Sequence, residues 1–179
     1  MSAEPRPGLT IVYTGQGKGK TTAAFGLALR MVGHGWKVLV LQFLKGPIES
    51  GERLAARRLQ PELTVRTLGS GYVCLKGAPP SAEERALART AWLTALQAIS
   101  EHPWDAVILD EVNVLTSLGL LSVDEVMRLV ETRPPSLTLV LTGRDADRRL
   151  CHVADIVTDM SAVRHVYHTG RADIPGIDR

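Results

Sequence analysis

The feature that most constrains this chain is a glycine-rich stretch at residues 14–22, Thr-Gly-Gln-Gly-Lys-Gly-Lys-Thr-Thr. It follows an apolar run at residues 9–13 and precedes a helix-like segment at residues 23–30. A strand, a glycine-rich turn ending in Lys-Thr and a helix are the layout of a phosphate-binding P-loop. In such a loop the backbone N–H groups surround the anion, and the positive end of the helix dipole favours its charge. We therefore predict a nucleotide-phosphate site at residues 15–22.

The side chains of this loop have separate expected roles. Lys20 would bring a mobile cation to the phosphates, and the hydroxyl of Thr21 a hard oxygen ligand for Mg²⁺. Arg30, further along the helix, is a more ambiguous candidate. The predicted ATP-binding residues are Gly15, Gln16, Gly17, Lys18, Gly19, Lys20, Thr21, Thr22 and Arg30.

One position departs from the usual pattern. The P-loop consensus has glycine where this chain has Thr14, and a β-branched residue tolerates a positive φ poorly. We expect Gly15 and Gly17 to make the turn instead. The alternative interpretation is a flexible Gly-Lys linker without a ligand, which the strand and helix patterns on either side disfavour.

Apolar runs and helical patterns alternate along the rest of the chain. This alternation predicts an α/β fold, with a mostly parallel sheet and helices on both of its faces. The length of 179 residues favours a single domain over residues 1–179, preceded by a loose arm at residues 1–8. Strands are expected at residues 9–13, 38–43, 63–67, 106–111, 137–142, 155–158 and 163–167, and helices at residues 23–33, 51–59, 81–101, 122–132 and 145–152.

A second group of polar residues follows the predicted strands. Ligands of parallel sheets bind at the carboxyl ends of the strands, which places Gln42, Glu111 and Arg144 beside the P-loop. The Asp110-Glu111 pair ends an apolar run, as does the carboxylate that reaches the Mg²⁺ of a bound nucleotide in many P-loop proteins. The alternatives are an acid pair and an arginine that simply face water. Glu111 could orient a water molecule or bind the metal, and spacing does not decide between these roles.

Composition and charge narrow the possible partners, cellular location and kinds of catalysis. The net charge is +2, without a dense Lys/Arg block, so nucleic-acid binding is unsupported. No apolar run approaches the roughly 18 residues of a membrane span and no signal peptide is evident, so we expect a cytoplasmic protein. The scattered histidines and the two cysteines have no zinc-site spacing and no Ser/Cys–His pattern, so covalent catalysis by the protein is also unsupported.

Blocks of sequence along almost the whole chain carry a specific resemblance. They stand at residues 13–26, 33–35, 42–46, 51–53, 109–111, 142–144, 154–160 and 176–178. In content and order they resemble the P-loop corrinoid adenosyltransferases of the cobalamin pathway, the CobA/CobO/BtuR family. In this family a threonine precedes the first glycine, which accounts for Thr14. The resemblance implies a RecA-like P-loop NTPase fold, commonly assembled as a homodimer.

The resemblance also implies a reaction. The family transfers the 5′-deoxyadenosyl group of ATP to the Co(I) centre of a reduced corrinoid and releases triphosphate. The corrinoid would be cobalamin, cobinamide or cobyrinic acid a,c-diamide, and an electron-donating reductase would be a partner. Lys20, Glu111 and Arg144 would be catalytic, with Mg²⁺ held by Thr21 and Glu111. The cobalt itself is the nucleophile, so the protein needs no base.

The resemblance weakens in one loop. The family typically has Phe-x-Trp there, thought to displace the lower ligand of the corrinoid, whereas this chain has Tyr72-Val73-Cys74. Tyr72 and Cys74 are thus the expected corrinoid contacts, and a thiol is smaller than an indole and can itself bind cobalt. From the residues alone, two other functions stay open: a P-loop ATPase or small-molecule kinase, and a nucleotide-gated binding module without catalysis.

Overall fold

The computed structural model describes residues 6–46, 49–69, 71, 79–164, 174 and 176–177. Strands and helices alternate through these residues. In chain order they are β1 (Thr10–Thr14), α1 (Lys20–Gly33), β2 (Val38–Gln42), α2 (Gly51–Ala56), the 3-10 helix η1 (Arg57–Leu59), β3 (Leu63–Thr67), α3 (Ala82–Glu101), β4 (Ala106–Asp110), α4 (Val112–Ser117), α5 (Val123–Thr132), β5 (Thr138–Thr142), α6 (Arg148–Val153) and β6 (Ile156–Asp159).

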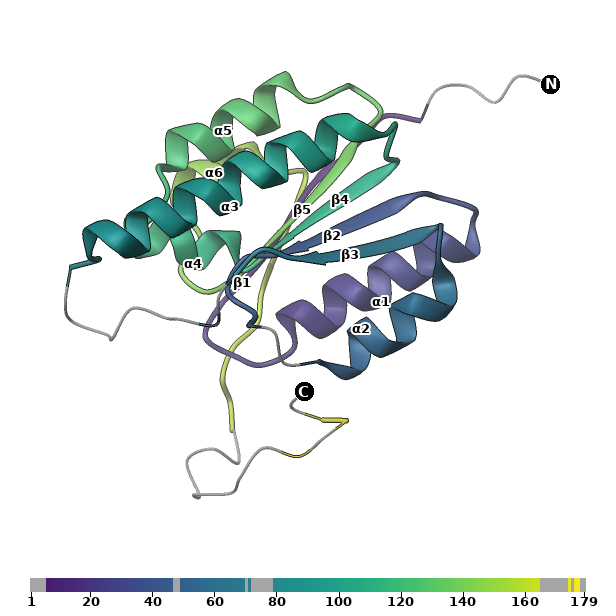
Figure 1. The fold of residues 1–179 in the computed structure, drawn as a ribbon, viewed down its shortest axis with the longest axis horizontal. Helices are drawn as coiled ribbons and strands as arrows, with labels where there is room; N and C mark the ends of the chain where they lie inside the picture. Colours follow the sequence, from purple (N-terminus) through teal and green to yellow (C-terminus); the bar gives the residue numbers. More distant parts are fainter. Residues whose placement is uncertain are drawn as a thin grey trace.

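The strands form one sheet in the order β3-β2-β4-β5-β1-β6, and every neighbouring pair is parallel. Figure 1 shows α1 and α2 on one face of this sheet and α3, α4, α5 and α6 on the other. The predicted α/β fold with helices on both faces is therefore confirmed. Parallel neighbours leave all strand carboxyl ends at one edge, which is where the P-loop follows β1.

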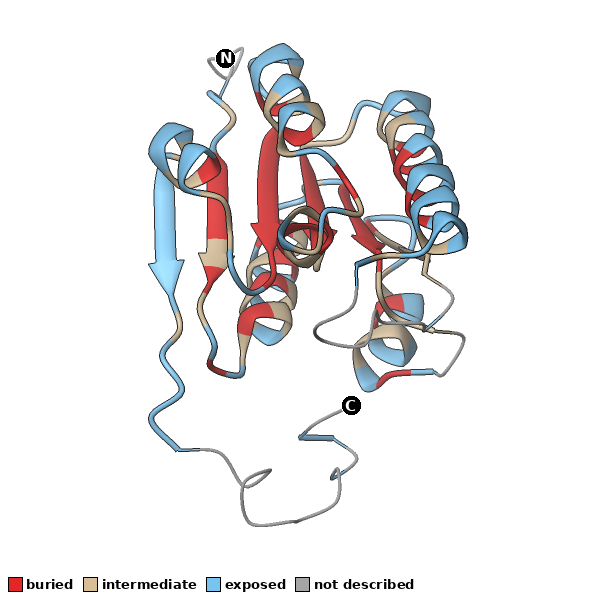
Figure 2. Ribbon diagram, turned by 90° about the vertical axis from the view of Figure 1, so that its left-hand side faces the viewer, coloured by how far each residue is buried: buried red, intermediate tan, exposed pale blue. Residues whose placement is uncertain are grey.

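Burial on both faces explains the continuous apolar runs of the central strands. In β2, Val38 and Val40 pack with α1, whereas Leu39 and Leu41 pack with Trp92 of α3 and its neighbours. All four side chains are fully buried. In Figure 2 the central strands are correspondingly red, with partly exposed helices around them.

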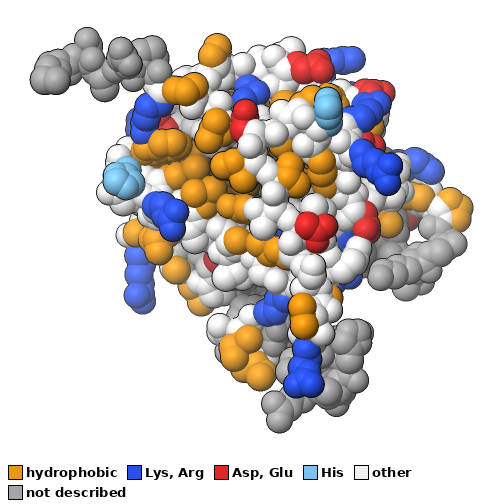
Figure 3. All heavy atoms as spheres, turned by 180° about the vertical axis from the view of Figure 1, so that it is seen from behind, with side chains coloured by type: hydrophobic (Ala, Val, Ile, Leu, Met, Phe, Trp, Pro, Cys, Tyr) orange, Lys and Arg blue, Asp and Glu red, His pale blue; other side chains and the backbone are white. Residues whose placement is uncertain are grey.

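Strand β6 forms an exposed edge of the sheet. All four of its residues are exposed, and Ile156 and Val157 each keep 44% of their surface accessible. Figure 2 shows this strand in pale blue beside β1, and Figure 3 shows hydrophobic side chains gathered on the face that carries it. The edge strand leads directly into the residues that follow Asp159, which lie against the P-loop.

Serine side chains cap the starts of two helices. Ser81 Oγ accepts a hydrogen bond of 3.1 Å from the Glu84 N–H, and the Glu84 carboxylate accepts one of 2.7 Å from the Ser81 N–H. Together the two hydrogen bonds form a capping box at the start of α3. Ser122 caps α5 by accepting a single hydrogen bond from the Asp124 N–H at 3.2 Å.

Three details of the predicted elements are wrong. Helix α4 was not expected from the sequence, because it is short and begins directly after the left-handed Glu111. The helix expected from Asp145 begins at Arg148, since Asp145 has a φ of 55°, outside the helical region. Val163 and Arg164 belong to no strand, and the rest of the strand expected at residues 163–167 lies outside the described residues.

The described part of the N-terminal arm is held rather than loose. Arg6 lies 3.3 Å from Asp105, and its guanidinium lies 4.2 Å from the centre of the Trp36 ring. The N–H of Gly8 donates to Pro135 O at 2.7 Å. These contacts bring residues 6–8 to the amino edge of the sheet, opposite the P-loop. No helix among the described residues is long and apolar enough to cross a membrane.

Candidate active site

The P-loop turns at two of its glycines. Gly15 has a φ of 95° and Gly19, the residue before α1, a φ of 115°, both in the region that favours glycine. Gly17 was expected to share the turn but has no such φ. Glycine is required there for another reason, because a Cβ would lie 2.6 Å from the carbonyl oxygens of Met160 and Ser161.

Lys20 occupies the centre of this loop. It is the first residue of α1, and only 6% of it is exposed. Its Nζ donates hydrogen bonds of 2.6 Å to both Gly15 O and Gly17 O. Burial lowers the pKa of Lys20, while the nearby carboxylate of Glu111 raises it. The ammonium group thus lies inside the ring of backbone groups that would surround a phosphate.

A buried carboxylate joins the first helix to the central strands. Asp110 Oδ1 accepts hydrogen bonds from Thr21 Oγ1 at 2.9 Å and from Thr142 Oγ1 at 2.7 Å. Its Oδ2 accepts one of 3.0 Å from Gln42 Nε2. Asp110 itself is fully buried. Both oxygens of the carboxylate therefore have hydrogen-bond partners inside the protein.

Glu111 continues from this strand end in an unusual backbone conformation. Its φ of 68° is in the left-handed region, and its N–H donates to Thr142 Oγ1 at 2.9 Å. Burial raises the pKa of its carboxyl group, and the charge of Asp110 raises it further. The positive charges of Lys20 and Arg144 oppose this shift. A left-handed glutamate is strained, so its carboxylate is held beside these cations at a conformational cost.

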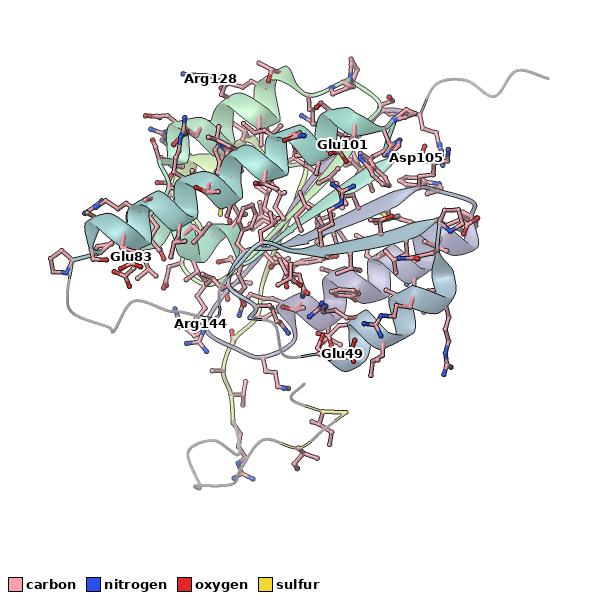
Figure 4. All side chains as sticks on the ribbon, viewed as in Figure 1. Glu49, Glu83, Glu101, Asp105, Arg128 and Arg144 are labelled. Atoms are coloured by element: carbon pink, nitrogen blue, oxygen red, sulfur yellow. The ribbon has the colours of Figure 1, made fainter. Side chains whose placement is uncertain are left out.

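Arg144 approaches from the next strand. It follows Gly143, where a Cβ would lie 3.0 Å from Val114 N, so glycine lets α4 pack against the end of β5. The Arg144 side chain is exposed and lies below the carboxyl edge of the sheet in Figure 4, far from Asp105 at the opposite edge. Its charge lowers the pKa of both Lys20 and Glu111.

The structure therefore brings Lys20, Thr21, Glu111 and Arg144 to one edge, as expected from the sequence. Gln16 also lies there, with its Nε2 donating to Asp145 Oδ1 at 2.6 Å. Lys18 and Thr22 are exposed on the loop and on the first turn of α1.

Two expected groups of site residues are not brought to this edge. Arg30 is exposed ten residues after Lys20 in the same helix, about 15 Å along its axis at 1.5 Å per residue. The structure therefore does not place Arg30 at the P-loop of this chain. Tyr72 and Cys74 lie outside the described residues, so their corrinoid contacts stay predictions.

Asp110 is a functional candidate that was not among the site residues predicted from the sequence. A signal for it was present, because alternate residues of a strand share a face. Ala106 and Ile108 pack on the α1 side of the sheet, so Asp110 points toward α1 and its Thr21 hydroxyl. Glu111, one residue beyond the strand, does not follow this alternation.

These residues fit an Mg²⁺ ion bound together with a nucleotide. The Thr21 hydroxyl donates a hydrogen bond to Asp110, which leaves the oxygen lone pairs of Thr21 available to a hard cation. No three His, Cys, Asp or Glu side chains gather as a metal cluster within the described part of the chain. The ion would accordingly depend on phosphate oxygens for several of its ligands, as Mg²⁺ commonly does.

A largely apolar pocket opens on the other face of the same edge. Its volume is about 350 Å³, and it lies between the ends of β2 and β3, α3 and the residues around α4. It reaches Gly69, shortly before the predicted corrinoid contacts. Apolar side chains dominate its lining: Phe43, Leu68, Leu87, Ala91, Leu115 and Leu120.

Comparison with known proteins identifies the family. The model of the family described as ATP:corrinoid adenosyltransferase BtuR/CobO/CobP matches residues 6–178. The chain belongs to this family. It is 35% identical to the corrinoid adenosyltransferase of Pseudomonas aeruginosa, covering 98% of this chain and 86% of that protein. The enzyme of the same name from Escherichia coli is 36% identical, with 98% and 88% covered.

A third relative, the corrinoid adenosyltransferase CobA of Salmonella typhimurium, is 34% identical over 98% of this chain and 88% of that protein. Membership makes the chain an ATP:corrinoid adenosyltransferase, as the sequence blocks had indicated. An ATPase or kinase is not favoured.

Proposed function

We propose that this adenosyltransferase holds the triphosphate of ATP in the loop of residues 15–22 and releases it intact. The observation that carries the proposal is Lys20, whose Nζ lies at the centre of the loop within 2.6 Å of two of its carbonyl oxygens. An ammonium group in that position meets the phosphates of any nucleotide that enters the loop. Its charge, together with that of Arg144, would offset the charge that builds on the leaving triphosphate.

The bond changes follow from the family reaction. The lone pair of Co(I) attacks C5′ of ATP, and a Co–C bond forms. The C5′–O bond breaks, and the triphosphate leaves with its electron pair. Cobalt is thereby oxidised to Co(III), and no proton is transferred. The protein needs no general base for this step; its task is to hold C5′ in line with the cobalt.

Thr21, Asp110 and Glu111 would hold the Mg²⁺ that accompanies ATP. Bound there, the ion would supply positive charge next to the triphosphate. The Thr21–Asp110 hydrogen bond fixes the position of the threonine hydroxyl beside the carboxylate. Glu111 lies near the cations Lys20 and Arg144 and would complete the charge balance of the loaded site.

The corrinoid would lie beside the nucleotide at the same sheet edge. The apolar pocket between α3 and the ends of β2 and β3 offers hydrophobic surface to part of such a ligand. Tyr72 and Cys74, which follow Gly69 in the chain, would contact it near the cobalt. We propose cobalamin, cobinamide or cobyrinic acid a,c-diamide as the substrate, in the biosynthesis or salvage of adenosylcobalamin.

We also propose the setting in which the enzyme works. Co(I) requires an electron donor, so a reductase would deliver electrons to the corrinoid. The enzyme would be a cytoplasmic homodimer, as commonly found in the family the sequence resembles. Nucleic acid and membrane are not among the proposed partners.

Identification of the products tests this proposal. The purified chain is incubated with MgATP and chemically reduced cobalamin, and the products are separated by chromatography. We expect adenosylcobalamin and triphosphate in equal amounts. Formation of ADP and phosphate at the same rate with and without corrinoid would instead support an ATPase, with Glu111 orienting water.

A further inference from the structure

The last residue of strand β6 and the two residues after it run alongside the P-loop. Strand β6 pairs with β1 up to Thr14 and Asp159, and the Met160 N–H then donates to Thr14 O at 2.9 Å. The next hydrogen bond joins the loop itself, because the Gly17 N–H donates to Met160 O at 2.6 Å. We call residues 159–161 the wall segment.

Each glycine of the loop faces this segment. A Cβ on Gly15 would lie 2.5 Å from Met160 O, and one on Gly17 would lie 2.6 Å from both Met160 O and Ser161 O. A Cβ on Gly19 would lie 3.7 Å from Met160 Sδ, an ordinary contact distance. The wall segment thus runs the length of the loop, and its backbone is what excludes side chains at Gly15 and Gly17.

We propose that Met160 is a positioning residue. Its carbonyl oxygen accepts the hydrogen bond of the Gly17 N–H, so that this N–H is not available to a bound phosphate. P-loops bind phosphate through their backbone N–H groups, and the Gly17 N–H is already paired with the Met160 carbonyl. The triphosphate is therefore bound by the N–H groups of residues 18–22 together with Lys20. This inference rests on the proposed nucleotide site and specifies which of its donors the ligand uses.

The same segment fixes the shape of the loop without a ligand. The bond from Gly17 holds the middle of the loop, and the bond to Thr14 holds its beginning. Gly17 is buried, and its N–H is paired within the chain before any ligand enters the loop. We expect this pairing to persist when a phosphate occupies the loop, so that the nucleotide meets a preformed cradle.

NMR of the unmodified chain tests the proposal directly. A scalar coupling across the hydrogen bond between Gly17 N and Met160 carbonyl carbon is measured before and after inorganic triphosphate with Mg²⁺ is added. We expect the coupling in both states, with large amide shifts at Gly19, Lys20 and Thr21. Loss of the coupling on triphosphate binding would overturn the proposal while leaving the proposed function standing. Absence of any shift in residues 15–22 would overturn both.

Two variants of Met160 separate its backbone from its side chain. Met160→Pro removes the N–H that bonds Thr14 O, and we expect the KM for ATP to rise about tenfold, the effect of one hydrogen bond. Met160→Ala keeps that N–H, so its rise in this KM should be smaller than that of Met160→Pro. In both variants the KM for the corrinoid should stay unchanged. Equal rises in the two KM values in Met160→Pro would indicate a general structural role and contradict the proposal.

Discussion

Thr142 Oγ1 lies 2.7 Å from Asp110 Oδ1 and joins β5 to β4 at the edge of the sheet that carries the P-loop. The same hydroxyl accepts a hydrogen bond of 2.9 Å from the Glu111 N–H. One buried threonine therefore orients the carboxylate that receives Thr21 and also holds the backbone of Glu111. The two acids of the site therefore share this hydroxyl as a hydrogen-bond partner.

Thr142→Val tests the role of this hydroxyl. Valine has nearly the same shape but leaves the Glu111 N–H without its partner, so we expect a loss of about 1–3 kcal/mol in the free energy of unfolding. Affinity for MgATP should fall as well, because Asp110 and Glu111 lose their orientation. Denaturant unfolding and calorimetry measure the two effects. Thr138→Val, at the amino end of the same strand, is the matched control and should leave nucleotide affinity unchanged. Equal affinities in the two variants would contradict the interpretation.

Asp110→Asn should weaken the effect of magnesium on ATP binding. The amide cannot accept from all three donors around it, and loss of charge-assisted hydrogen bonds costs about 1.5–3 kcal/mol each. We expect weaker ATP binding in Mg²⁺ and little change in the presence of a chelator, as measured by calorimetry. Asp155→Asn is the control, because Asp155 Oδ2 accepts from the Thr10 N–H, at 2.7 Å, at the other end of the sheet. If Asp155→Asn abolished the magnesium effect equally, the assignment would be wrong.

Lys20→Ala should remove the central cation of the loop. Loss of one group that stabilises a developing negative charge typically lowers turnover by about 10²–10³-fold, and we expect a decrease of that size in adenosyl transfer. The far-ultraviolet circular dichroism spectrum should be unchanged. Lys37→Ala, an exposed lysine just before β2, serves as the control and should retain full activity. A Lys20→Ala enzyme with normal turnover would exclude the proposed role of this ammonium group.

Glu111→Gln should make the ligand-free chain more stable at neutral pH. Burial and Asp110 raise the pKa of Glu111 above its ordinary value of 4.5, so the folded state binds this proton more tightly than the unfolded state. Stability is then lost as pH rises from the ordinary pKa through the raised one. Glutamine does not titrate, so the variant avoids this loss of stability. Its gain in melting temperature should be absent at a pH below the ordinary pKa of glutamate and largest at a pH above the raised pKa of Glu111. A gain in melting temperature that is the same at every pH would contradict this interpretation. Adenosyl transfer should fall in the same variant.

Cys74→Ala tests the expected corrinoid contact. If the loop of residues 72–74 acts on the lower ligand of the corrinoid, removal of the thiol changes the electronic spectrum of bound Co(II) cobalamin in the presence of ATP. Tyr72→Phe, which keeps the ring, should change it less. An unchanged spectrum in Cys74→Ala would reject that role for the thiol.

Local patterns were sufficient for much of this protein. The glycine spacing of the loop, the apolar runs of the strands and the Ser81–Glu84 capping box depend on residues close in sequence, where backbone geometry and hydrogen bonding act directly. They predicted the α/β sheet and the strand and helix that flank the glycine-rich loop. Helix α4 escaped because its start depends on the left-handed Glu111, a conformation that no sequence periodicity indicates.

The sequence by itself determined that a P-loop follows the first strand and that acids and an arginine end later strands. Only the tertiary structure decided which of these groups meet. Thr21 and Asp110 are 89 residues apart, and their hydrogen bond exists because the order of the strands brings α1 over the end of β4. Met160 reaches Gly17 because β6 pairs with β1 rather than with another strand. Strand order is set by the packing of the whole sheet, and the sequence of a single strand does not indicate which strand will pair with it.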